Sequence, residues 1–137
     1  MSIRENLQCV REKIVAACAR AGRDASSVKL VVVTKTATAE TIRELIALGA
    51  ADIGENRVQD AARKLALIGL PQLEPHARPT IHMIGHLQTN KAAQAVRLFD
   101  IIHSIDSLRV AEAVSRAAQA QGRLMPGLME VNIAGEQ

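Results

Sequence analysis

Lys35 is the residue of this sequence whose type and position best fit covalent chemistry. It follows Thr34 and the apolar run Leu30–Val33, in which three of the four residues are β-branched. Such a run is typical of a strand that is buried on both faces. Because side chains alternate along a strand, Val31, Val33 and Lys35 should share one face. A lysine that a strand places in a dry cleft loses its proton more readily and becomes a nucleophile, whereas a lysine that begins a solvated loop remains a charged surface residue.

Polar residues also end the later apolar runs. The second run leads to Glu55 and Asn56, the third to His86 and the fourth to Ser104–Asp106, while the fifth contains Asn132. The carboxyl ends of parallel strands meet at one edge of a sheet, which is where the active residues of α/β barrels lie. We therefore expect these polar side chains to gather near Lys35.

The spacing of apolar residues predicts one helix, then four strand–helix pairs, then a final strand. Ser2 and Glu5 form a capping box at the start of the first helix, and Gly22 is a suitable end for it. Strands and helices that alternate in this way are typical of a parallel sheet. The expected strands cover residues 29–34, 51–53, 80–84, 100–104 and 127–133, and the later helices cover 40–48, 58–68, 90–98 and 108–122.

Two architectures are consistent with this order of elements. A doubly wound open sheet needs a glycine-rich turn after its first strand, and residues 34–38 contain no glycine. A (β/α)8 barrel of the TIM type needs polar residues at its strand ends and about 250 residues in all. The sequence therefore favours an incomplete barrel of about five strands with an N-terminal helix, and residues 1–137 form a single domain in this interpretation.

Composition narrows the classes of function. With 48% hydrophobic and 23% charged residues, the chain is typical of a globular protein. There is no apolar run of membrane-spanning length and no signal-peptide pattern, so we expect a cytoplasmic protein without a membrane partner. A net charge of +3 with one Phe and no Trp or Tyr gives no platform for nucleic acid. Cys9 and Cys18 should lie on opposite faces of the first helix as free thiols.

Motifs at the strand ends make a family resemblance recognisable. They read VVVTKT from Val31, IGENRVQD from Ile53, IHMIGHLQTNK from Ile81 and IHSIDS from Ile102. In this order and spacing they resemble the pyridoxal phosphate homeostasis protein family, and the resemblance covers essentially the whole chain. It implies an alanine-racemase-like barrel that carries pyridoxal 5'-phosphate (PLP) as a Schiff base on Lys35, a role in vitamin B6 homeostasis, and PLP-dependent apo-enzymes as partners.

The resemblance also suggests further cofactor contacts. Asn56 could face the cofactor ring, or it could cap the next helix with Gln59 at the capping-box position. His86 begins a loop, ending at Lys91, that resembles the family's loop over the site mouth. Asn132 on the fifth strand is a further candidate contact. The serine- and glycine-rich turns and the arginine that hold the cofactor phosphate late in the family's barrel have no counterpart in the sequence.

Other polar residues have simpler interpretations. His82 lies inside the third strand and is expected to be a hydrogen-bonded core residue. His82 and His86 lie on a strand and a loop rather than on one helix face, so we expect no metal site. Ser104 and Asp106 close the fourth strand, and Asp106 could equally cap the next helix.

The sequence is consistent with three functions. A cofactor carrier without turnover fits the resemblance best. A PLP-dependent amino-acid racemase or decarboxylase of the same barrel type is the alternative, but the racemases pair the lysine with a tyrosine and this sequence has none. In the third interpretation Lys35 is only a point charge for a phosphate ligand.

Overall fold

The computed structural model describes residues 1–135, and its centre is a parallel sheet of five strands in the order β1-β2-β3-β4-β5. Every neighbouring pair of strands is parallel, so each connection returns to the same end of the sheet. The strands are β1 Val32–Val33, β2 Asp52–Glu55, β3 Thr80–Met83, β4 Ile101–Ile105 and β5 Gly127–Met129.

Helices precede and connect these strands in the predicted order. They are α1 Ile3–Arg20, α2 Ala39–Ala47, α3 Val58–Ile68, α4 Ala92–Leu98 and α5 Leu108–Ala120, with short 3-10 turns η1 Ala25–Ser27, η2 Leu70–Gln72 and η3 Thr89–Lys91. The predicted capping box of α1 is confirmed, because Ser2 Oγ accepts from the Glu5 N–H while Glu5 Oε2 accepts from the Ser2 N–H. Among the described residues, no helix has the length and apolarity needed to cross a lipid bilayer.

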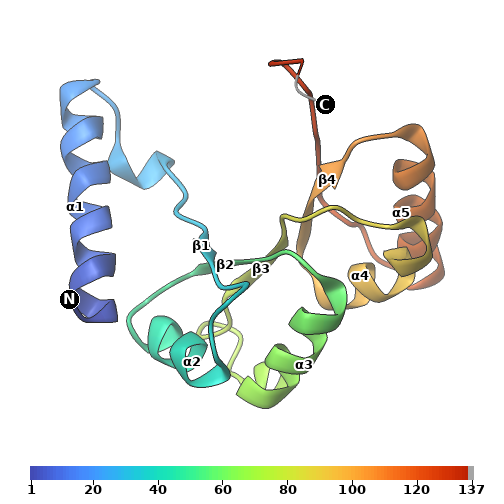
Figure 1. The fold of residues 1–137 in the computed structure, drawn as a ribbon, viewed down its shortest axis with the longest axis horizontal. Helices are drawn as coiled ribbons and strands as arrows, with labels where there is room; N and C mark the ends of the chain where they lie inside the picture. Colours follow the sequence, from blue (N-terminus) through green and yellow to red (C-terminus); the bar gives the residue numbers. More distant parts are fainter. Residues whose placement is uncertain (136–137) are drawn as a thin grey trace.

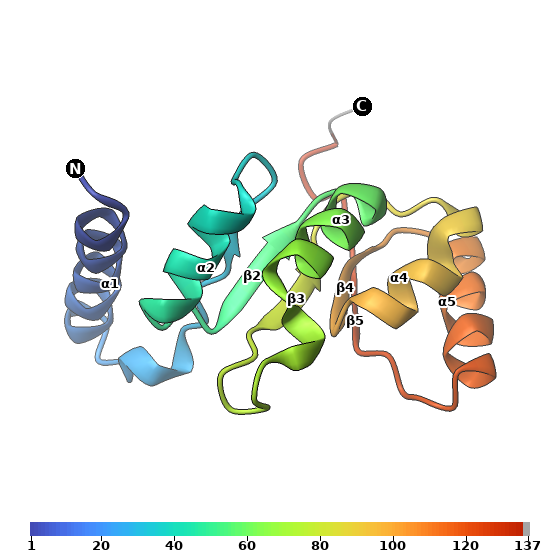
Figure 2. The same cartoon turned by 90° about the horizontal axis from the view of Figure 1, so that it is seen from below.

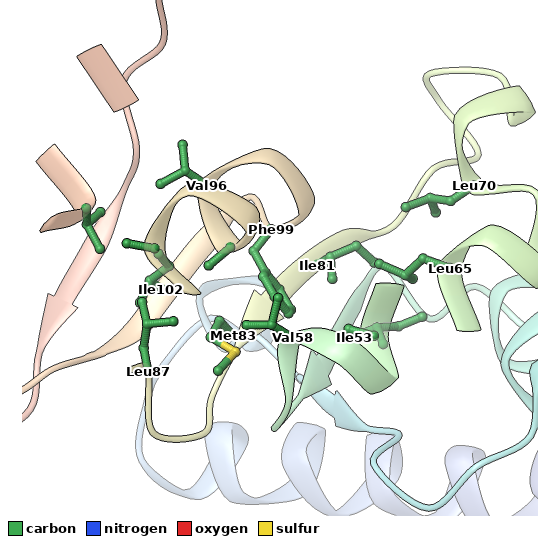
Figure 3. Packing of buried hydrophobic residues seen from close by; sticks show 14 of the residues in the cluster. Ile53, Val58, Leu65, Leu70, Ile81, Met83, Leu87, Val96, Phe99 and Ile102 are labelled. Carbon is green, nitrogen blue, oxygen red and sulfur yellow. The ribbon is translucent and has the colours of Figure 1, made fainter. Parts of the chain in front are cut away.

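The connecting helices α2 to α5 cover one face of the sheet, and within residues 1–135 no helix covers the other face (Figures 1 and 2). The sheet curves with its helices on the outside, which is the arrangement of an incomplete α/β barrel. The core lies between the sheet and the helices, where Figure 3 shows the apolar side chains gathered. Phe99, Ile53, Ile81 and Ile102 are fully buried there.

Helix α1 lies at the β1 edge of the sheet and packs on it through a second, smaller core. Leu7 of α1 is buried against Leu45 of α2 and Ala50. Arg11 reinforces this contact, because its guanidinium donates to the carbonyl oxygens of Leu48 at 3.1 Å and Gly49 at 2.8 Å. Cys18 is buried on α1, and Cys9 and Cys18 are both free thiols, as predicted.

The first and last strands differ from their predictions. The expected strand over residues 29–34 contains only Val32–Val33, and the expected strand over 127–133 ends at Met129. The prediction that the first strand is buried on both faces is wrong, since the Val33 residue is 52% exposed. The physical reason is that Val31, Val33 and Lys35 share the face of the sheet that no described element covers.

Candidate functional site

Lys35 lies in a tight turn between β1 and α2. The preceding residue, Thr34, is buried, and its N–H donates to the carbonyl oxygen of Gly54 on β2 at 2.9 Å. The Thr34 carbonyl accepts from the Ala37 N–H at 2.9 Å, which closes the turn. The Lys35 side chain itself is exposed, so the dry environment expected for it is not present in the described residues.

The main chain of this turn is held by a buried ion pair. The ammonium of Lys64 on α3 donates to the carbonyl oxygens of Thr34 at 2.7 Å and Lys35 at 3.0 Å. It also lies 2.9 and 3.1 Å from the two carboxylate oxygens of Glu55. The Thr34 hydroxyl donates to Glu55 Oε1 at 2.6 Å, and the side chains of Lys64 and Glu55 are 8% and 1% exposed.

Sequence reasoning missed this pair. The sequence indicates Glu55 only as one of the polar residues that end the second apolar run, and it gives Lys64 no role. The spacing of residues in the sequence does indicate that Lys64 is buried. It lies three residues after Ala61 and four before Ile68, at the edge of the apolar stripe of α3. A lysine in that place is buried only with a partner, and the strand end before the helix offers a carboxylate.

A hollow of about 260 Å³ opens beside the turn that follows β2, and it is polar and basic. Its basic side chains are those of Arg57, His86 and Lys91, and no carboxylate lines it. Lys35 is not part of its wall. The full lining is Asn56, Arg57, Val58, Gln59, Met83, His86, Leu87, Gln88 and Lys91.

Two neighbouring loops form this hollow through a close contact at Gly85. A Cβ atom at Gly85 would lie 2.1 Å from the main-chain oxygen of Asn56, so only glycine fits. The Ile84 N–H donates to the Glu55 carbonyl oxygen at 2.9 Å and fixes the same contact one residue earlier. The backbone therefore brings Asn56 and His86 together, as the sequence predicted for residues at adjacent strand ends.

The three further residues predicted to contact the cofactor lie in different surroundings. Asn56 is half-buried and lines the hollow, but it is not the cap of α3; that position belongs to Arg57, which makes no side-chain capping bond. His86 is exposed, and its Nδ1 lies 3.5 Å from the Asp106 carboxylate. Asn132 was predicted on the fifth strand and instead lies after β5, where its Oδ1 accepts from the Gly135 N–H at 2.8 Å.

His82 is a hydrogen-bonded core residue, as predicted. Its Nε2 lies 2.7 Å from Asp52 Oδ1 and its Nδ1 lies 2.8 Å from His103 Nε2. Burial raises the pKa of Asp52, but hydrogen bonds from His82 and Lys29, together with their charges, outweigh burial and hold that pKa below its usual value. Burial, helped by the charge on His82, lowers the pKa of His103.

The remaining candidates are structural in this chain. Ser107, rather than Asp106, caps α5, because the Val110 N–H donates to its hydroxyl. Ser104 is buried, and its hydroxyl has no hydrogen-bond partner among the described residues. Within residues 1–135, no group of three or more His, Cys, Asp or Glu side chains could hold a metal ion.

Comparison with known proteins finds relatives that match the whole chain, although no family profile matches it. The pyridoxal phosphate homeostasis protein of Aquifex aeolicus is 36% identical over 137 residues, which are 100% of this chain and 58% of that protein. The protein of the same name from Escherichia coli is 37% identical over 137 residues, covering 98% of this chain and 56% of its own length.

The chain is similar over its whole length to proteins named pyridoxal phosphate homeostasis protein. It spans about half the length of the curated relatives that it matches. Among solved structures, PipY of Synechococcus elongatus with PLP bound is 38% identical, with a TM-score of 0.75 over 92% of this chain and 56% of PipY. A structure of an unknown protein from Bifidobacterium adolescentis is 36% identical, with a TM-score of 0.88 over 98% of this chain and 56% of its own.

The side chains at this edge of the sheet fit an anionic aldehyde such as PLP. Lys35 offers an exposed primary amine on a fixed turn at the end of β1. The hollow after the neighbouring strand β2 offers the donors of Arg57, His86 and Lys91, with no carboxylate in its wall. The amide of Asn56 can donate to an oxygen atom or accept from a donor. The donor set therefore suits a phosphate-bearing ligand.

Proposed function

We propose that the chain binds PLP covalently through the amine of Lys35 and belongs to a protein that holds the cofactor for PLP homeostasis. The observation that carries this proposal is the exposed amine of Lys35 on a turn anchored at the carboxyl edge of the sheet. The relation to PipY, which was solved with PLP bound, supports it. In this proposal, residues 1–137 form a single cofactor-binding unit of a (β/α) barrel.

Each residue near Lys35 has a defined part in this proposal. When bound, PLP supplies an aldehyde that condenses with a lysine amine and releases water. The anchored turn presents the Lys35 amine, while Asn56 and His86 contact the cofactor from the adjacent strand ends. Lys91, which lines the same hollow, adds positive charge for the anionic groups. Asn132 lies beyond β5, and in this proposal its side chain contacts PLP only when the cofactor is bound.

The chain carries the cofactor and does not turn over a substrate in this proposal. General acid–base work on both faces of a bound amino acid needs a second group with a suitable pKa, and the sequence has no tyrosine for that purpose. A carrier of this kind would act in the cytoplasm and pass PLP to PLP-dependent apo-enzymes.

A titration of the full chain with PLP tests the proposal. Visible absorbance should show a saturable band at low micromolar chain concentration, and Lys35→Ala should lose it. Lys13→Ala is the matched control, because Lys13 is an exposed lysine on α1 away from the site, and it should bind as the original chain does. Equal bands in the Lys35→Ala and Lys13→Ala variants would overturn the proposal.

A further inference from the structure

We propose that Lys64 is a positioning residue for cofactor attachment, and that its buried ammonium fixes the turn that presents Lys35. Glu55 has the supporting part, since its carboxylate holds the ammonium in place. This inference rests on the proposed attachment of PLP to Lys35, and it assigns a role to two buried side chains that act through the main chain of the turn.

Every proton of the Lys64 ammonium has a hydrogen-bond acceptor. An ammonium has three protons and accepts no hydrogen bond. Two protons point to the carbonyl oxygens of Thr34 and Lys35, at 2.7 and 3.0 Å, and the third lies between the two carboxylate oxygens of Glu55. No proton is left to rotate toward solvent, so the ammonium holds both carbonyl groups in one orientation.

The turn is tied on both sides of Lys35. Before it, the Thr34 N–H is bonded to β2 through Gly54, and the Thr34 hydroxyl is bonded to Glu55. After it, the Ala37 N–H closes the turn on the Thr34 carbonyl. The main chain of Lys35 is therefore fixed to both β2 and α3, while its side chain is exposed. Such a fixed base limits the positions that the reactive amine can reach.

Stability alone does not explain a buried ion pair at this place. Removing two charges from water costs free energy that their attraction often fails to recover, and apolar pairs of similar volume are frequently as stable. The pair of Lys64 and Glu55 instead satisfies the main chain of the one turn that carries Lys35. A displacement of about 1 Å in a reacting group can cost roughly a hundredfold in rate, so an anchor at this point has a direct effect on attachment.

The double variant Glu55→Leu/Lys64→Met separates positioning from folding. It removes both charges together and leaves no unpaired buried ion, so it should fold and melt cooperatively. We expect its rate of borohydride-trapped PLP attachment at Lys35 to fall by roughly tenfold or more, because the turn is released. Lys29→Met is the control for a lost lysine, since Lys29 pairs with Asp52 outside the turn and should leave the rate unchanged.

Amide hydrogen exchange in the same proteins provides a readout that does not depend on PLP. In the original chain the Ala37 amide should exchange as slowly as core amides such as that of Ile102, which is fully buried and donates to the Pro126 carbonyl oxygen. In the double variant the Ala37 amide should exchange much faster while that of Ile102 stays protected. If the double variant does not fold, the original chain decides the matter, because fast Ala37 exchange there would show that the turn is not held.

The outcomes distinguish this inference from the function on which it rests. Failure of the original chain to form any adduct at Lys35 would overturn the proposed function. Normal attachment in the original chain, with equal rates and equal Ala37 exchange in the double variant, would overturn the positioning role of Lys64 and leave the proposed function intact.

Discussion

The ammonium of Lys64 donates a hydrogen bond to the main-chain carbonyl oxygen of Lys35, with the two atoms 3.0 Å apart. Through this contact a buried side chain on α3 reaches the residue that is proposed to hold the cofactor. The same ammonium is paired with Glu55 at the end of β2, so strand, turn and helix meet at one point.

Removing one partner of this pair should be far more damaging than removing both. Lys64→Met leaves the Glu55 carboxylate buried without its cation, so the free energy of unfolding should fall by about 3–5 kcal/mol. Glu55→Leu/Lys64→Met leaves no buried ion and should lose only about 1–3 kcal/mol, because the Thr34 and Lys35 groups lose their hydrogen bonds to the pair. Lys29→Met, whose ammonium side chain is 62% exposed, should cost less than about 1 kcal/mol. Urea denaturation measures all three, and a double variant as unstable as Lys64→Met would contradict this account.

The contact between Gly85 and Asn56 should tolerate no side chain. In Gly85→Ala the new Cβ would lie 2.1 Å from the Asn56 main-chain oxygen, so one of the two loops must move. We expect a loss of about 1–3 kcal/mol in thermal or urea unfolding, together with weaker PLP binding. Gly127→Ala is the control, because its nearest contact is the flexible Ile105 side chain at 3.3 Å. Equal stability of the two variants would argue against this loop contact.

The network of Asp52, His82 and His103 should make folding stability depend on pH. The pKa of His103 is lowered by burial and by the charge on His82, so the folded chain takes up a proton less readily than the unfolded chain. The contribution of His103 to the free energy of unfolding is therefore fully present above the pKa of an unfolded histidine, about 6.5. That contribution is lost as the pH falls through the lower pKa of His103 in the folded chain.

His103→Gln should flatten the decline of unfolding free energy between pH 7 and pH 5. His76→Gln is the control, since His76 is exposed and lies in the loop before β3, outside this network. The Asp52 carboxylate acts in the same direction at lower pH, because its lowered pKa gives stability that is present above its unfolded value and lost on further acidification. An unchanged slope in His103→Gln would show that this histidine is not the source of the dependence.

The chain should lack amino-acid racemase activity. With PLP present, the rate at which L-alanine is converted to D-alanine should not exceed the rate with free PLP in buffer. The sequence has no tyrosine that could transfer a proton on the face of the bound amino acid opposite the lysine. Chiral chromatography of the products measures this directly. Steady conversion that disappears in Lys35→Ala would instead favour the racemase alternative.

Local patterns were sufficient to predict most of the fold. Helix α3 has the predicted bounds, from Val58 to Ile68, because its apolar period and Gly69 are both local signals. The capping box of Ser2 and Glu5 is local for the same reason. Alternation of strands and helices likewise predicted the parallel order of the sheet.

The predictions that were wrong or incomplete concern features that depend on contacts between residues far apart in the sequence. Whether Val33 and Lys35 are covered depends on elements that face the inner side of the sheet, and the apolar run itself carries no information about them. The pairing of Glu55 with Lys64 depends on how α3 lies over the end of β2. Asn132 was placed on a strand because Val131 and Ile133 flank it, yet β5 ends before this segment.

Mapping the reduced adduct tests the central claim most directly. The full chain is incubated with one equivalent of PLP, reduced with borohydride and digested with trypsin, which does not cut after a modified lysine. We predict a pyridoxyl adduct on a single peptide covering residues 30–43, with the modification at Lys35, and no such peptide from Lys35→Ala. An adduct spread over Lys13, Lys29 and Lys91, or persisting at equal yield in Lys35→Ala, would contradict the account.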